Sequence, residues 1–187
     1  MNIKKIVVGP LLENCYFLVK NNDLIIIDPG DEFKKIDKII TNNQFNLCAI
    51  LITHAHFDHV GALNDLVYKY KVPVYYNNIN KEIDYTRLID VIEGDYSVND
   101  FNFKVIYTKG HRNDLVTYYF YDDNVMFTGD FLFKNNIGRC DLEYSDILDM
   151  RKSIDKIKKY DDNIRIYPGH GDETVLGKEK ENNFYFN

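Results

Sequence analysis

The sequence predicts one mixed α/β domain spanning residues 1–187. Short apolar runs bounded by turn residues recur along the chain, as in buried strands. Between them, apolar residues keep the three- and four-residue spacing of helices packed on a sheet. The length suits one core, and no repeat or linker divides it. The expected strands are 3–8, 15–19, 24–27, 47–52, 101–107, 115–121, 125–128 and 164–167; helical faces are expected within 33–40, 60–70 and 147–157, the last after a cap at Ser145.

Composition and charge narrow the class of protein. The formal net charge of −6 disfavours a nucleic-acid partner, because proteins that grip phosphates usually carry a basic surface. No apolar run approaches the roughly 20 residues that cross a bilayer, and residues 9–13 interrupt the N-terminal run too early for a signal peptide. Cys15, Cys48 and Cys140 are scattered, as expected for reduced thiols in the core. We expect a cytoplasmic protein with no membrane partner; the oligomeric state stays open.

Polar side chains follow the expected strands at the point where each strand ends. Such placement is typical of sites in α/β proteins, where strands deliver polar groups to loops along one rim. Convergence of these loops is an inference from the pattern. The residues are Asp28, His54, His56, His111, Asp130 and His170.

The segment Thr53-His54-Ala55-His56-Phe57-Asp58-His59 predicts a metal site. A lone histidine is more often a surface or core residue than a ligand. Here, however, three of the chain's five histidines fall around one aspartate, and the other two each follow an apolar strand. Imidazole and carboxylate suit zinc, iron or manganese. Ions about 3.5–4 Å apart, as in two-metal hydrolases, could share ligands this close in sequence.

These residues resemble the metallo-β-lactamase fold superfamily, and within it the compact, single-domain relatives of the glyoxalase II (hydroxyacylglutathione hydrolase) branch. The resemblance extends over nearly the whole chain, and its central H-x-H-x-D-H motif is highly specific. The flanking motifs are individually weak but occur in the right order. The segments that carry it are Glu13-Asn14-Cys15-Tyr16-Phe17-Leu18, Asp28-Pro29-Gly30, Thr53–His59, Lys109-Gly110-His111, Thr128-Gly129-Asp130, Gly138-Arg139-Cys140-Asp141, Tyr167-Pro168-Gly169-His170-Gly171 and 177–183.

The resemblance implies an αβ/βα four-layer sandwich and two divalent ions, with zinc first and iron or manganese as alternatives. It implies that His54, His56 and His111 hold one ion, that Asp58, His59 and His170 hold the other, and that Asp130 bridges them. A hydroxide between the ions would attack the carbonyl of a small S-2-hydroxyacyl thioester. Asp58 and Asp130 are the expected catalytic residues, with Asp58 mainly a ligand.

Outside the ligand set, three residues carry weaker expectations. Asp28 is either a tautomer-fixing acceptor for a ligand histidine or a turn residue of Asp-Pro-Gly. Arg139 falls where glyoxalase II enzymes place a basic residue beside the substrate, so an anion-binding role competes with a solvated or structural one. Lys109 is a further candidate for substrate binding. It departs from the Pro-Gly-His-Thr of many relatives, as does Arg112. Larger relatives add a C-terminal helical domain, which we expect to be missing here; this puts glutathione specificity in question.

The sequence also leaves four alternatives to a thioesterase. A mononuclear-iron persulfide dioxygenase of the same superfamily would need only His54, His111 and Asp130. A phosphodiesterase or nuclease is disfavoured by the charge, and a lactamase by the expected cytoplasmic location. A non-catalytic protein that kept the fold should have lost some of the seven ligands.

Overall fold

The computed structural model describes residues 1–186. The chain forms two compact units, one of residues 1–91 with 97–101 and one of residues 92–96 with the chain from 102 onward. The mixed α/β class is confirmed, because both units combine a β-sheet with helices. The expectation of a single domain stays a prediction.

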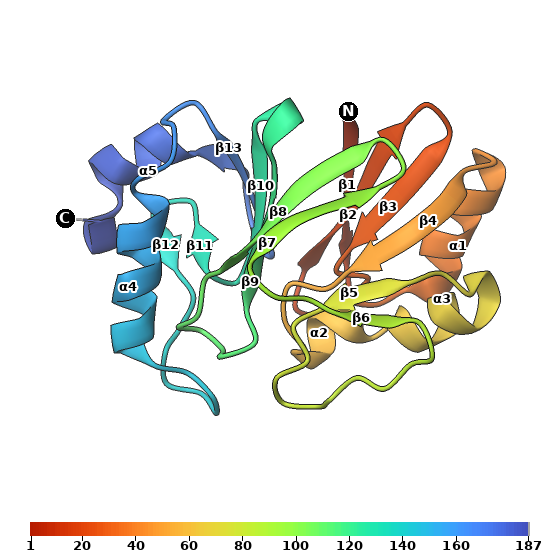
Figure 1. Cartoon of the computed structure of the whole chain (residues 1–187), viewed down its shortest axis with the longest axis horizontal. Helices are drawn as coiled ribbons and strands as arrows, with labels where there is room; N and C mark the ends of the chain where they lie inside the picture. Colours follow the sequence, from red (N-terminus) through yellow and green to blue (C-terminus); the bar gives the residue numbers. More distant parts are fainter. Residues whose placement is uncertain (187) are drawn as a thin grey trace. The chain divides into compact units, whose positions relative to one another are not determined.

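The first unit is built on a six-stranded sheet of order β1-β2-β3-β4-β5-β6 (Figure 1). The pairs β1–β2 and β2–β3 are antiparallel, and the later pairs are parallel. The strands are β1 (Asn2–Val8), β2 (Glu13–Lys20), β3 (Asp23–Ile27), β4 (Asn46–Leu51), β5 (Val74–Tyr76) and β6 (Leu88–Asp90); the helices are α1 (Phe33–Asn42), α2 (Phe57–Val60) and α3 (Leu63–Tyr70).

Apolar stripes on the helices hold them to this sheet. Ile36 and Ile40 of α1 lie three and seven residues after the first helical residue, and both are buried against the sheet core. Burial of each such side chain stabilises the fold by about 1.5–3 kcal/mol. Helix α3 ends at Lys71, which is left-handed (φ 54°), two residues before Pro73. The helix therefore stops where the chain must turn into β5.

The second unit carries a sheet of order β14-β13-β10-β9-β8-β7 and a small hairpin of β11 and β12. Helix α4 packs on it through Met150, Ile154 and Ile157. The strands are β7 (Gly94–Val98), β8 (Phe101–Tyr107), β9 (Val116–Phe120), β10 (Val125–Gly129), β11 (Leu132–Phe133), β12 (Asn136–Ile137), β13 (Arg165–Pro168) and β14 (Thr174–Val175); the helices are α4 (Ile147–Ile157) and α5 (Leu176–Asn182), with 3-10 turns at Tyr121–Asp123 and Phe184–Phe186.

The order of strands brings the ends of several of them to one edge of each sheet. In the first unit β3 and β4 run parallel, so the residues that follow them emerge together. In the second unit β8 and β10 are each antiparallel to β9, and β13 is parallel to β10. The chain therefore leaves β8, β10 and β13 at the same edge.

All eight expected strands are present, with ends shifted by at most two residues. The helical face expected within 60–70 divides into α2 and α3. The cap of α4 is Asp146 and not Ser145: the Asp146 carboxylate accepts from the amides of Leu148 and Asp149, while the Ser145 hydroxyl donates to the carbonyl of Leu142. No helix among residues 1–186 is long and apolar enough to cross a membrane.

Candidate metal centre

The histidine-rich loop begins where β4 ends. The amide of Asp28, just after β3, donates to the carbonyl of Leu51 at 3.0 Å, so the loops after β3 and β4 start side by side. Thr53 and His54 are fully buried, and α2 then carries His59 into the interior. The parallel strand pair thus places Asp28 beside the histidine motif.

Asp28 accepts three hydrogen bonds from this loop. Its Oδ1 accepts from the amide of Thr53 at 2.7 Å. Its Oδ2 accepts from Thr53 Oγ1 at 2.6 Å and from His59 Nδ1 at 3.0 Å. The carboxylate is only 2% exposed and its φ of 48° is left-handed, so Asp28 is both the turn residue and a buried acceptor.

This arrangement fixes the tautomers of two histidines. The proton on His59 Nδ1 goes to Asp28, which leaves the lone pair on Nε2. Thr53 uses its hydroxyl proton on Asp28, so its oxygen accepts from His54 Nδ1 at 3.0 Å, and the lone pair of His54 is also on Nε2. Asp28 therefore acts on His59 directly and on His54 through Thr53.

The lone-pair nitrogens face other ligand atoms of the same loop. His54 Nε2 lies 3.1 Å from His56 Nδ1, and His59 Nε2 lies 3.9 Å from Asp58 Oδ2. The four motif residues of the first unit therefore offer nitrogen and oxygen atoms that could bind a metal ion, in pairs 3.1 and 3.9 Å apart.

Gly30 allows this packing. A Cβ at Gly30 would lie 1.8 Å from the carbonyl oxygen of Asp58 and 2.6 Å from Glu13 Oε2. Only hydrogen fits between the two loops, because real Cβ contacts are never this short. The Gly of Asp-Pro-Gly is thus needed for the close approach of the backbone to the histidine motif.

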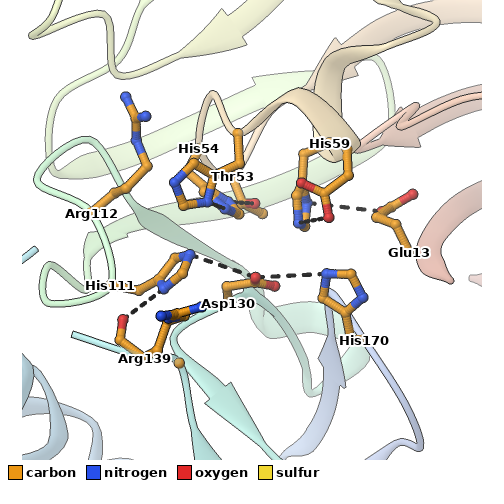
Figure 2. A network of polar contacts seen from close by, with 12 residues as sticks. Glu13, Thr53, His54, His59, His111, Arg112, Asp130, Arg139 and His170 are labelled. Carbon is orange, nitrogen blue, oxygen red and sulfur yellow. Dashed lines mark hydrogen bonds and ion pairs between the residues drawn. The ribbon is translucent and has the colours of Figure 1, made fainter. Parts of the chain in front are cut away.

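The second unit brings together His111, Asp130 and His170, which follow β8, β10 and β13. Asp130 lies between the two rings in Figure 2, and its Oδ2 is 3.6 Å from the Nε2 of each histidine. His111 Nδ1 donates to the backbone carbonyl of Arg139 at 2.8 Å, so its lone pair is again on Nε2. The amide of Gly169 donates to the carbonyl of Gly129 at 2.9 Å, which joins the two loops that carry Asp130 and His170.

The donor set fits a metal ion. A contact of 3.6 Å is too long for a hydrogen bond. Two ligand atoms on one zinc ion, each bonded at about 2.0–2.2 Å, lie roughly 3.0–3.7 Å apart. The 3.6 Å from Asp130 Oδ2 to each Nε2 falls in this range, as expected if the carboxylate shares an ion with each histidine. Neutral imidazoles with one carboxylate suit a divalent ion.

Gly138 plays the part in this unit that Gly30 plays in the other. A Cβ at Gly138 would lie 1.8 Å from the carbonyl oxygen of Asp130 and 3.0 Å from His111 Cβ. The segment after β12 therefore packs directly against both loops that carry these two ligands, the one after β10 and the one after β8.

Two residues at the site were not assigned a role from the sequence. Thr53 couples Asp28 to His54, as described above; its place directly before His54 was the available signal. Glu13, at the start of β2, is 1% exposed, and its Oε1 lies 3.9 Å from His59 Nδ1. It opens a segment that carries the family resemblance, but no pattern in the sequence places it near His59, because the two residues meet only through the fold.

The two candidates for substrate binding lie on the second unit. The exposed guanidinium of Arg139 binds Asp141 through two hydrogen bonds of 2.6 and 2.8 Å, and these bonds lower the pKa of the Asp141 carboxyl. Lys109 places Nζ 5.3 Å from the centre of the Tyr107 ring. Arg112, which stands after His111, is buried and bound to Asp114 at 2.8 Å. The substrate roles of Arg139 and Lys109 stay predictions.

The structure places four predicted ligands in one unit and three in the other. His54, His56, Asp58 and His59 gather in the first, and His111, Asp130 and His170 gather in the second. In the first unit all four come from the segment that follows β4, and in the second they come from three loops, after β8, β10 and β13, that the sheet order brings together.

Comparison with known proteins gives consistent results. The family model described as "Metallo-beta-lactamase superfamily" matches residues 8–170. The "Probable metallo-hydrolase YqgX" of Bacillus subtilis is 33% identical, over all of this chain and 98% of that protein. The "Hydroxyacylglutathione hydrolase GloC" of Haemophilus influenzae is 31% identical, over 100% and 99% of the two chains.

Solved structures agree with the fold. The BLEG-1 B3 metallo-beta-lactamase aligns with a TM-score of 0.91 and 29% identity over 99% of each chain. TTHA1623, solved in a di-iron-bound form, aligns with a TM-score of 0.86 and 30% identity over 97% of this chain and 99% of that one. The predicted metallo-β-lactamase type of fold is thereby confirmed, and the chain belongs to the metallo-beta-lactamase superfamily.

Proposed function

We propose that this protein is a hydrolase with two metal ions that cleaves S-2-hydroxyacyl thioesters. Membership of the superfamily supports a metal-dependent hydrolase. The observation that carries the two-metal proposal is the donor set, with seven ligand side chains and lone pairs fixed on Nε2 of His54, His59 and His111. The thioesterase activity is supported by relatives named hydroxyacylglutathione hydrolase, at 31–36% identity.

In this proposal the ligands divide between the two ions as the family resemblance implies. His54, His56 and His111 would hold one ion, and Asp58, His59 and His170 the other. Asp130 would serve both, because its Oδ2 already lies equally far from His111 and His170. The two ions, zinc in first place with iron or manganese as alternatives, would supply a deprotonated water at neutral pH and stabilise the oxyanion of the attacked carbonyl.

The residues around the ligands would keep them ready for this chemistry. Asp28 and Thr53 hold protons on the Nδ1 side of His59 and His54, and the Arg139 carbonyl does so for His111. None of these rings then needs to change tautomer before it binds an ion, which lowers the free-energy cost of loading. A thiolate is a good leaving group and needs no general acid.

The substrate's carrier would be an anionic thiol small enough to reach the site. Lys109 stands two residues before His111 in the same loop, and the backbone carbonyl of Arg139 accepts from His111 Nδ1. Because Arg139 is bound by Asp141, a substrate carboxylate would have to replace Asp141 to reach the guanidinium. Lys109 is held only over an aromatic ring among the contacts described above, so it is the more available of the two cations.

A second candidate is hydrolysis of β-lactams, favoured by the BLEG-1 structure, which is titled a B3 metallo-beta-lactamase. The mononuclear-iron dioxygenase alternative would need only three of the seven ligands and would leave His56, Asp58, His59 and His170 without a task. Iron itself is compatible with this fold, because TTHA1623 was solved with two iron ions. The number of metal ions per chain therefore separates the dioxygenase from the two hydrolases, and the substrate that is turned over separates the thioesterase from the β-lactamase.

The test starts with metal-free protein reloaded with Zn²⁺ or Fe²⁺ and measures bound metal by mass spectrometry. Each form is then assayed with S-lactoylglutathione, thioesters of other thiols, a chromogenic cephalosporin, and glutathione persulfide with oxygen uptake. We expect two ions per chain and turnover of the 2-hydroxyacyl thioesters. The variant Asp130→Asn should lose at least 100-fold in kcat/KM, whereas Asp155→Asn, exposed on α4 and paired with Lys158, should not. Two bound ions with no thioester turnover would refute the proposed activity.

A further inference from the structure

The last helix of the second unit buries a carboxylate that no step of the proposed reaction uses. Glu179 lies in α5 (Leu176–Asn182) and is fully buried. Its Oε1 accepts from Thr174 Oγ1 at 2.6 Å. Its Oε2 accepts from the amide of Asn135 at 2.8 Å and from Asn183 Nδ2 at 2.9 Å. A buried carboxylate costs free energy unless such hydrogen bonds compensate it, so its presence calls for an explanation.

The partners of Glu179 belong to the two segments that follow ligands. Asn135, left-handed at φ 60°, forms the tip of the β11–β12 hairpin, which begins two residues after Asp130. Thr174 starts β14, four residues after His170. One side chain thus joins the continuation of the Asp130 loop to the continuation of the His170 loop.

Further contacts between these segments run through the same hairpin. The ring of Phe133 in β11 meets the ring of His170 edge-on, with centroids 6.2 Å apart. Lys134 Nζ binds Asp172 Oδ2 at 3.0 Å on the surface. Asn183 Nδ2, besides its bond to Glu179, donates to the carbonyl of Asn136 at 3.1 Å. The hairpin is therefore held from α5 on one side and contacts the His170 ring on the other.

We propose that Glu179 is a positioning residue for the metal ligands His170 and Asp130, acting through the β11–β12 hairpin and through Thr174. This inference rests on the proposed metal binding. A carboxylate suits the task because it accepts on both oxygens and so can pull two segments toward α5 at once. An apolar side chain of similar size would fill the space but would leave the Asn135 amide and the Thr174 hydroxyl without this acceptor.

The test uses two variants that cut the network differently. Glu179→Gln keeps the size but loses the negative charge and one acceptor oxygen. With the remaining oxygen on the Asn135 amide, the new NH₂ group faces the Thr174 hydroxyl, which must accept instead of donate, so both segments are held by weaker, neutral bonds. Thr174→Val removes only the bond on the His170 side. Glu181→Gln, exposed on the same helix, is the matched control. Hydrogen–deuterium exchange of the metal-free proteins and zinc titration of the same samples are the two measurements.

In the metal-free Glu179→Gln protein we expect faster exchange in residues 131–138 and 170–175, with residues 23–27 and 46–51 unchanged. Zinc affinity of the weaker site should fall about tenfold, within the range seen when supporting residues of metal ligands are replaced. Thr174→Val should affect residues 170–175 alone and also weaken zinc binding, and Glu181→Gln should match the wild type.

Two outcomes would overturn the proposal. Uniformly faster exchange in both units would mean that Glu179 only stabilises the fold. Local loosening with unchanged zinc affinity would mean that the network does not position ligands. If wild-type protein binds no zinc at all, the proposed function fails, but the exchange measurement still decides whether Glu179 holds the two ligand segments.

Discussion

Replacing Asp28 by Asn would test whether one carboxylate sets the protonation pattern of the histidine motif. Asn tolerates the left-handed backbone of this position, so the change is confined to the side chain. With its oxygen on the Thr53 amide, the new NH₂ group would face Thr53 Oγ1 and His59 Nδ1. Both would then have to accept, so the His59 proton would move to Nε2. Thr53 would donate to His54, whose proton would move to Nε2 as well.

The size of the effect follows from the bonds that change. A hydrogen bond to a buried charged group contributes about 1.5–3 kcal/mol, and Asn keeps part of this network. We expect the free energy of unfolding to fall by about 2–4 kcal/mol and Tm by roughly 5–10 °C. Metal affinity should fall about 10–100-fold, because both rings must change tautomer before they bind an ion.

Long-range ¹H–¹⁵N NMR of the metal-free protein reads the tautomers directly, and zinc titration reads the affinity. The exposed Asp65→Asn in α3 is the control and should change neither. Asp28→Asn with its histidine protons still on Nδ1 and with wild-type zinc affinity would refute the reasoning.

Three further predictions follow. Gly138→Ala should lower the free energy of unfolding by about 3 kcal/mol and reduce bound metal, since its Cβ would lie 1.8 Å from a ligand-loop carbonyl. Gly171→Ala, with open space around it but φ 76°, should cost only about 1 kcal/mol in chemical denaturation; equal losses would contradict the geometry. Burial, followed by the Asp23 contact, raises the pKa of Cys48 to about 11, so about one thiol in a thousand is ionised at pH 8. Iodoacetamide should therefore label Cys48 slowly in folded protein and faster as the pH rises from 9 to 11. Rapid labelling at pH 8 would contradict a raised pKa of the Cys48 thiol. Arg139→Gln should raise KM for an anionic thioester roughly five- to tenfold with unchanged metal content, because the His111 contact uses only its backbone carbonyl; an unchanged KM would remove Arg139 from the substrate site.

Local patterns were enough to predict most of the secondary structure. Strands such as Leu24–Ile27 are continuously apolar and read clearly, whereas β6 and β7 carry exposed polar residues and were missed. Helix α5 has the sequence Leu-Gly-Lys-Glu-Lys-Glu-Asn and no apolar periodicity. Its buried positions are Leu176 and Glu179, and a buried glutamate cannot be foreseen from a pattern that assigns charges to the surface.

The amino-acid sequence alone determined the α/β class, the family resemblance and the seven candidate ligands, because histidines and aspartates clustered beside strand ends leave a readable pattern. Tertiary structure decided what surrounds those ligands. Asp28 binds His59 directly and acts on His54 through Thr53, Glu13 lies near His59, and Glu179 reaches Asn135 in the hairpin after Asp130. These contacts join residues 25 to 46 positions apart. Such contacts come from strand order and register, which no local periodicity encodes.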